Sequence, residues 1–121
     1  MKTLLRGLTG FVAALSLLCG CGQKTGTQLS SAELKAFDSA PPEIKQMWST
    51  ALEVSKTNDY VGGQTLFYKL LSGELSPDQR SAVSKASTDL NTRLYAAFEK
   101  GDPQAQKAIQ EMRANPPNRA R

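Results

Sequence analysis

The chain has 121 residues and a formal net charge of +4 at pH 7; 40% of its residues are hydrophobic and 21% are charged. This length accommodates one small domain, and the ordinary composition excludes a disulfide scaffold, a collagen-like chain and a wholly disordered polymer. Histidine is absent from the sequence, which removes the commonest general base, the histidine of a nucleophilic triad and the usual zinc ligand.

The beginning of the chain has the organisation of an export signal. Lys2 and Arg6 give a positively charged start, and residues 7–18 are uncharged and mostly apolar. About a dozen such residues are too few to cross the hydrocarbon core of a membrane, which needs roughly 20. The same length suits the apolar region of a signal peptide.

The sequence Leu18, Cys19, Gly20, Cys21 follows directly and resembles the lipobox of bacterial lipoprotein precursors. Only Cys21 fits the acceptor position, because a small residue must precede that cysteine and the bulky Leu18 precedes Cys19. The resemblance implies cleavage after Gly20 and attachment of a diacylglyceryl group to Cys21, with acylation of the new amino terminus giving a stable anchor. In enterobacterial lipoproteins an Asp after the cysteine favours the inner membrane, so Gly22 implies the outer membrane, facing the periplasm.

Four parts are expected along the chain. They are a signal peptide over residues 1–20, the lipidated cysteine with a flexible tether over 21–30, a small helical domain over 31–115, and a basic disordered tail over 116–121. A normally cleaved secreted protein and an uncleaved anchor are the alternatives at the amino terminus. The lack of an A-x-A-like cleavage site at the end of the apolar stretch favours the lipoprotein.

Helical signals recur throughout the predicted domain. Ser30 with Glu33 and Ser76 with Gln79 form capping-box patterns, and apolar side chains recur at helical spacing between the turn signals. The expected helices cover about residues 31–38, 42–57, 60–72, 77–100 and 103–114, with Gly73 as a terminator of the third. Sustained strand alternation is absent from the pattern. The predicted fold class is all-α, with four to five short helices packed as antiparallel hairpins.

The run from Asn58-Asp59-Tyr60 through Gly63 to Phe67 resembles a helical hairpin of the tetratricopeptide family. That family has a polar turn, an aromatic residue opening the second helix, a small residue where the helices cross and an aromatic residue one turn later. Ala51, twelve residues before Gly63, would be the second small residue of the crossing. The resemblance implies close helix packing, with the ring of Phe67 beside the crossing, but not a repeat array with a concave peptide groove.

Groups suited to catalysis are not gathered in the sequence. The carboxylates are scattered, and no serine has a histidine to activate it. Lys85, Asp89 and Arg93 follow one another at intervals of four, which predicts a ladder of ion pairs on an exposed helix face. We therefore expect neither an enzyme nor a metal site nor a cofactor, and an export signal argues against nucleic acid as a partner.

Four aromatic residues are candidates for an interface: Trp48, Tyr60, Tyr68 and Tyr95. Partial burial of the last two under the first short helix is the structural alternative. The first functional hypothesis is a non-catalytic adaptor for an unidentified envelope protein, with the oligomeric state left open. The alternatives are a small-ligand or envelope-polymer binding module, with a cleft near Trp48, Tyr60 and Phe67, and a membrane-surface spacer acting through its lipid and basic tail.

Overall fold

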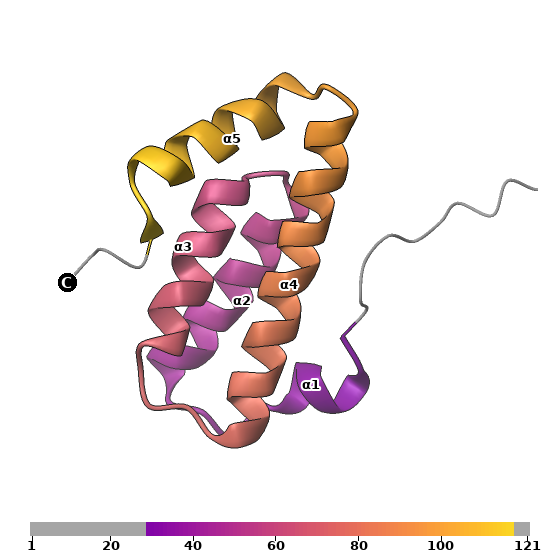
Figure 1. The fold of residues 1–121 in the computed structure, drawn as a ribbon. Coiled ribbons are helices and arrows are strands. Elements are labelled where there is room, and N and C mark those ends of the chain that lie inside the picture. The colour runs from indigo at the N-terminus through magenta and orange to yellow at the C-terminus, as the bar shows by residue number, and fades with distance from the viewer. Residues whose placement is uncertain (1–28, 118–121) are drawn as a thin grey trace, which may run out of the picture.

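The computed structural model describes residues 29–117, which form an all-α domain (Figure 1). In chain order the helices are α1 (Ser31–Lys35), α2 (Pro42–Lys56), α3 (Tyr60–Leu71), α4 (Pro77–Glu99) and α5 (Pro103–Ala114). The predicted all-α class and its five helices are confirmed. The expected signal peptide, Cys21 with most of the tether, and the last four residues of the expected tail lie outside the described residues.

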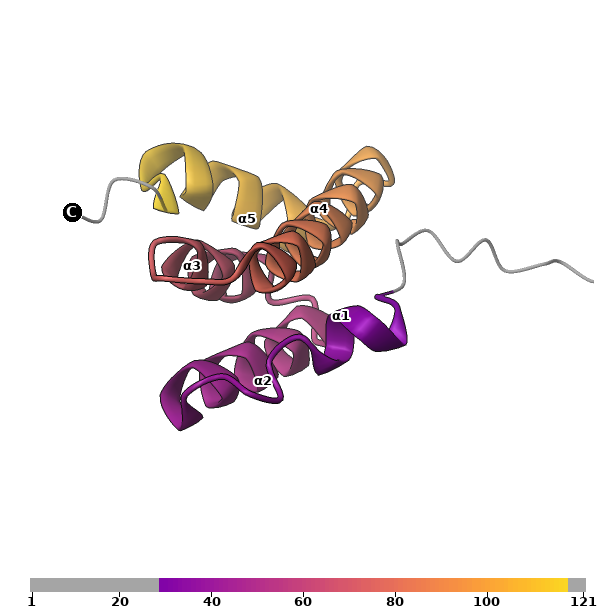
Figure 2. The same ribbon diagram turned by 90° about the horizontal axis from the view of Figure 1, so that it is seen from below.

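Helix α3 is the centre of the arrangement. It packs against α2, α4 and α5, whereas the short α1 packs against α4. The turned view shows α3 between α2 on one side and α5 on the other, with α4 alongside α3 (Figure 2). Helices α2, α3 and α4 run up and down beside one another, and α5 lies across the end of this bundle (Figure 1).

Both predicted capping boxes form. The Ser30 and Ser76 hydroxyls accept hydrogen bonds from the backbone N–H groups of Glu33 and Gln79, whose side chains in turn accept from the two caps. These reciprocal bonds satisfy amide groups that an unfinished helix end would leave without partners. Helix starts were therefore predictable from local sequence, because their hydrogen bonds are local.

Helix α1 is shorter than predicted. It ends at Lys35, and the chain turns over the next residues. The turn carries Phe37 into the core, where its ring stacks on Trp48 with 4.6 Å between centroids, while Leu34 stays half exposed. Only Phe37 lies on the side of the turn that faces α2.

Gly63 allows α3 to approach α4 closely. A Cβ atom at this position would lie 2.6 Å from Leu90 Cδ2 in α4 and 3.6 Å from the Cα of Ser55 in α2. The tightest contact at Gly63 is therefore with Leu90 of α4, and Ser55 rather than Ala51 provides the nearest part of α2, at ordinary contact distance. The contact lies one helical turn closer to the connection between α2 and α3, while Ala51 is buried in the core.

Three residues, 100–102, connect α4 to α5. Gly101 has φ +80°, and the backbone N–H groups of Gly101 and Asp102 donate to the carbonyls of Phe98 and Ala97. This is a Schellman motif. The Asp102 carboxylate then accepts from the backbone N–H of Gln104 and so begins α5. Gly73 differs, because its φ is not positive and α3 ends without a left-handed residue.

Helix α1 is joined to α4 by two polar contacts. Lys85 forms an ion pair with Glu33, and Gln79 Nε2 donates to the carbonyl oxygen of Ala36 over 3.1 Å. Lys85 thus pairs across the fold, and the predicted ladder along α4 is wrong at this end. The other predicted ion pair exists, with Arg93 Nε 3.0 Å from Asp89 Oδ2. These side chains are only 28% and 20% exposed, so the pair does not lie on a fully exposed helix face.

Gly101→Ala should lower the free energy of unfolding by about 1 kcal/mol, because an L-residue is strained at positive φ. Space is not the cause, since no atom lies within 4 Å of the added Cβ. Gly73→Ala is the matched control and should change stability by less than about 0.5 kcal/mol. Urea unfolding followed by Trp48 fluorescence measures both. Equal losses in the two variants would contradict the assignment of strain to Gly101.

Lys85→Met should raise the pKa of Glu33. In the folded protein the hydrogen bond from Lys85, and secondarily the one from the Ser30 backbone N–H, holds the pKa of this carboxyl below its ordinary value. A lowered folded pKa stabilises the fold above the unfolded pKa, and this contribution disappears as the pH falls through the folded pKa. NMR titration of the Glu33 side chain tests the shift. Lys45→Met, at an exposed position of α2, is the control and should leave the titration unchanged.

Candidate interaction groove

A shallow groove lies where α3, α4 and α5 meet. Its volume is about 270 Å³, and it is lined by Gln64, Tyr68, Asn91, Tyr95, Ile109, Met112, Arg113 and Pro117. Three helices and the start of the carboxyl-terminal segment therefore contribute to one surface. Pro117, which the sequence assigned to the tail, lines the groove, and Pro116 before it is half-buried as well.

The predicted interface residues divide into two pairs. Trp48 and Tyr60 are each 4% exposed and belong to the core, whereas Tyr68 is 42% exposed and Tyr95 is 59% exposed. The prediction that Trp48 and Tyr60 present their rings to a partner is wrong, because both rings fill the inside of the bundle. Phe67 is fully buried as well, so the cleft expected beside these three rings is occupied by packed core.

Tyr68 and Tyr95 both line the groove on the α5 side of the molecule. No described residue of α1 lines this groove, and both tyrosine side chains are exposed. The structural alternative of burial under the first short helix is therefore wrong. These two tyrosines are the members of the predicted set that remain available for a contact.

The direction of the two helices brings the tyrosine rings together. Side chains of an α-helix lean toward its amino terminus, and α3 and α4 form an antiparallel pair (Figure 1). Tyr68 follows Gln64 by one turn in α3, and Tyr95 follows Ser87 by two turns in α4, so the tyrosines lie on opposite sides of the Gln64–Ser87 contact. Each ring consequently leans toward the middle of the groove.

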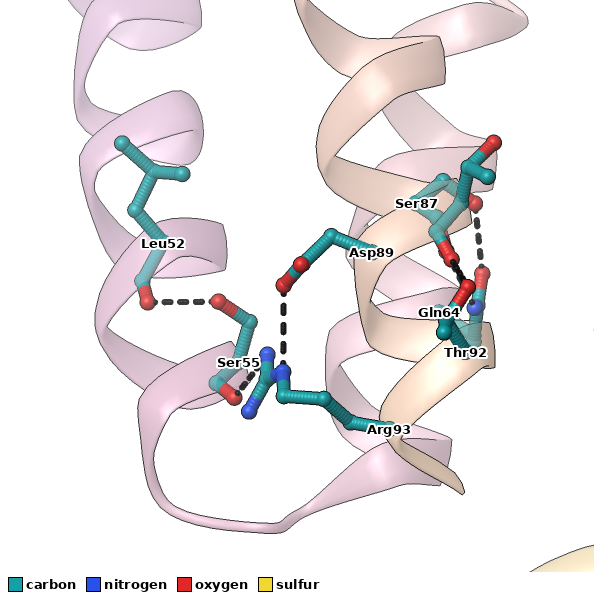
Figure 3. A network of polar contacts seen from close by, with 8 residues as sticks. Leu52, Ser55, Gln64, Ser87, Asp89, Thr92 and Arg93 are labelled. Atoms are coloured by element: carbon teal, nitrogen blue, oxygen red, sulfur yellow. Dashed lines mark hydrogen bonds and ion pairs between the residues drawn. The ribbon is translucent and has the colours of Figure 1, made fainter. Parts of the chain in front are cut away.

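Gln64 and Ser87 form the polar contact beneath the groove (Figure 3). The Gln64 Nε2 atom donates to the Ser87 carbonyl oxygen over 3.1 Å, and the Ser87 hydroxyl donates to Gln64 Oε1 over 2.8 Å. Gln64 is only 2% exposed, so both ends of its amide need these partners. The contact fixes how α3 lies along α4.

Sequence reasoning did not identify Gln64. A signal was present, because Gln64 stands four residues after Tyr60 and three before Phe67, within the buried stripe of α3. A polar side chain at a stripe position indicates a buried hydrogen-bonding partner. The partner itself, Ser87, lies 23 residues away and cannot be found from local spacing.

Arg93 joins α4 to the end of α2. Its Nη2 atom donates to the Ser55 carbonyl oxygen over 2.9 Å, and its Nε atom pairs with Asp89 (Figure 3). Ser55 lies in the last turn of α2, where carbonyl groups lack helical partners and a positive charge is favourable. Arg93 is therefore committed to holding the fold and is not available to a ligand.

Arg113 is the charged residue of the groove lining. Residues 29–117 contain two other arginines, Arg80 and Arg93, and each donates to a backbone carbonyl. Arg113 forms no ion pair within this range. The guanidinium group is exposed on α5, and it stands beside aromatic and amide side chains rather than beside a carboxylate.

A second hollow of similar size lies between α5 and the connection from α2 to α3. Its volume is about 290 Å³, and it is lined by Asn58, Asp59, Tyr60, Val61, Gly62, Gln104, Lys107, Ala108 and Glu111. Carboxylates and an amine occur together in this lining. One Asp59 oxygen already accepts the Gly62 backbone N–H over 2.9 Å as the cap of α3. This surface has mixed charge and lacks an exposed aromatic pair.

Among the described residues, no helix has the length and apolar character needed to span a membrane, and no group of three or more histidine, cysteine or acidic side chains is placed to hold a metal ion. Comparison with protein-family models, with curated proteins and with solved structures finds no significant match to the chain. The lipobox and tetratricopeptide resemblances therefore stay predictions from the sequence.

Ser87→Ala should lower the free energy of unfolding by about 1–2 kcal/mol, because it leaves the buried Gln64 Oε1 atom without its hydroxyl donor. Ser84→Ala, at an exposed position of the same helix, is the control and should change stability by less than about 0.5 kcal/mol. Chemical denaturation of the two variants gives the comparison. A Ser87→Ala variant as stable as the control would show that the Gln64–Ser87 contact does not hold α3 on α4.

Proposed function

We propose that this protein is a lipid-anchored component of the bacterial cell envelope whose helical domain is a non-catalytic protein-interaction module. In this proposal Cys21 carries the lipid and holds the domain at the outer membrane, on its periplasmic side. The partner is an envelope protein that docks in the groove between α3, α4 and α5.

The anchor is supported by the agreement of three sequence features. A basic start, an apolar stretch of about a dozen residues and the Leu18-to-Cys21 box follow in the order that a lipoprotein precursor requires. Two or more acyl chains hold a protein at a membrane, where one chain gives only marginal binding. A chain fixed in this way acts at the membrane surface.

The exposed tyrosine pair is the observation that carries the interaction proposal. Tyr68 and Tyr95 are 42% and 59% exposed and line one groove together with Met112 and Arg113. Tyrosine, methionine and arginine are the side chains enriched at protein interfaces, where rigid aromatic rings give contact area at small entropic cost. The groove favours a macromolecular partner over a small ligand, because the rings form an open surface.

A photo-crosslinking amino acid placed at Tyr95 should capture one discrete envelope protein in intact cells, since the ring lies at the proposed contact. The same group at Thr50, exposed on α2, is the control and should not capture that protein. The Cys21→Ala variant should lose the product because the domain is released from the membrane. Mass spectrometry of the recovered product identifies the partner and gives the mass of the lipid on the amino terminus of this protein.

Equal products from positions 95 and 50 would contradict the groove as the interface. An amino terminus that carries no lipid would contradict the anchor. A lipidated protein at normal abundance that yields no product from position 95 would contradict the interaction module as a whole.

A further inference from the structure

We infer that the groove between α3, α4 and α5 binds a linear peptide segment that carries one carboxylate and one apolar side chain. In this arrangement Arg113 pairs with the carboxylate, Tyr68 and Tyr95 flank the segment, and the apolar side chain rests on Met112. This inference rests on the proposed function and specifies the chemistry of the partner.

Charge is the first argument. Among the described residues, Arg113 is the one ionised side chain that lines the groove, and no carboxylate lines it. Arginine presents a planar fork of N–H donors that matches a carboxylate in a bidentate pair. The nearest acidic residue in sequence, Glu111, lines the second hollow instead. The groove therefore offers a positive group that the described part of the fold leaves unneutralised.

Shape is the second argument. Tyr68 and Tyr95 are separated by about three helical turns along the bundle, since they lie one turn and two turns on opposite sides of the Gln64–Ser87 contact. At 1.5 Å per residue this corresponds to about 18 Å between their backbones. An extended peptide covers this length with about five residues, so it can lie along the groove between the two positions and contact both rings.

The floor of the groove suits an apolar side chain. Ile109 is 6% exposed and forms a fixed base, while Met112 is half-buried beside it. Methionine has three rotatable bonds and adapts its shape to a partner. A leucine, isoleucine or phenylalanine side chain entering between the tyrosine rings would cover both residues.

A neutral glycan is disfavoured by the same lining. A neutral sugar carries no charge, so it cannot form an ion pair with Arg113. Among the described residues the groove lining contains no carboxylate, whereas the second hollow has Asp59 and Glu111. The two hollows have similar volumes, so their difference in charge makes the second one an internal control.

The experiment selects ligands from a phage-displayed library of random 12-residue peptides, using the purified full chain in detergent micelles. Enriched peptides should place Asp or Glu within three positions of Leu, Ile, Phe or Met. A fluorescein-labelled copy of the most enriched peptide then gives a Kd by anisotropy. Arg113→Ala should weaken binding about tenfold to a hundredfold, because a hydrogen-bonded charge pair is lost. Lys107→Ala, in the second hollow, should leave the Kd unchanged.

Reversing the charge at position 113 tests whether this side chain pairs directly with the peptide carboxylate or only contributes to the overall charge of the protein. Arg113→Glu should reject the acidic peptide and bind its Asp- or Glu-to-Lys counterpart more tightly than the unaltered protein does. Circular dichroism should be unchanged in every variant, because Arg113 is exposed.

Peptides enriched without an acidic residue, the same Kd in Arg113→Ala, or no enrichment above a Tyr68→Ala/Tyr95→Ala variant would each overturn the inference. Displacement of the peptide by neutral chito-oligosaccharides with a higher affinity would overturn it as well. These failures are distinct from failure of the proposed function, because crosslinking from Tyr95 reports any protein in the groove. A crosslinked partner whose contact segment lacks a carboxylate would retain the function and refute the inference.

Discussion

The absence of a side chain at position 63 sets how closely α3 can approach α4. Gly63 brings the backbone of α3 against Leu90 of α4 and Ser55 of α2, at distances that leave no room for a Cβ atom beside Leu90. The bond between Gln64 and Ser87 depends on this approach, because a hydrogen bond spans only about 3 Å. The groove depends on it too, since its two tyrosines project from α3 and α4.

Polar contacts between the helices add directional constraints to the apolar packing. The hydrophobic effect is non-directional, whereas the hydrogen bonds of a buried amide are satisfied in only a few positions. Gln64 fixes the position of α3 along α4, and Arg93 joins α4 to the last turn of α2. Lys85 and Gln79 join α1 and the turn after it to α4. Each contact joins elements distant in sequence. They lie around an apolar core that contains Trp48 and its stacked partner Phe37.

Sequence reasoning succeeded where the deciding interactions are local. Helix positions followed from caps, proline and apolar spacing, because these act within a few residues. It failed where a distant element decides the outcome. Trp48 and Tyr60 were expected at an interface, but nothing near them in sequence shows that Phe37 and the other helices cover them. Lys85 was expected to pair along its own helix, and its actual partner, Glu33, is 52 residues away. The groove requires three helices and has no local signature.

A small change in backbone direction at Gly101 and Asp102 produces a larger displacement at the far end of α5. One residue closes α4 in a left-handed conformation and the next begins α5, so these two residues set the direction in which α5 leaves α4. Arg113 lies ten residues beyond Pro103, roughly 15 Å along the helix axis. A change of about 10° in the direction of α5 would move Arg113 by about 2–3 Å, close to the length of a hydrogen bond. The register of the guanidinium group against the tyrosines is thus set by residues that lie outside the groove.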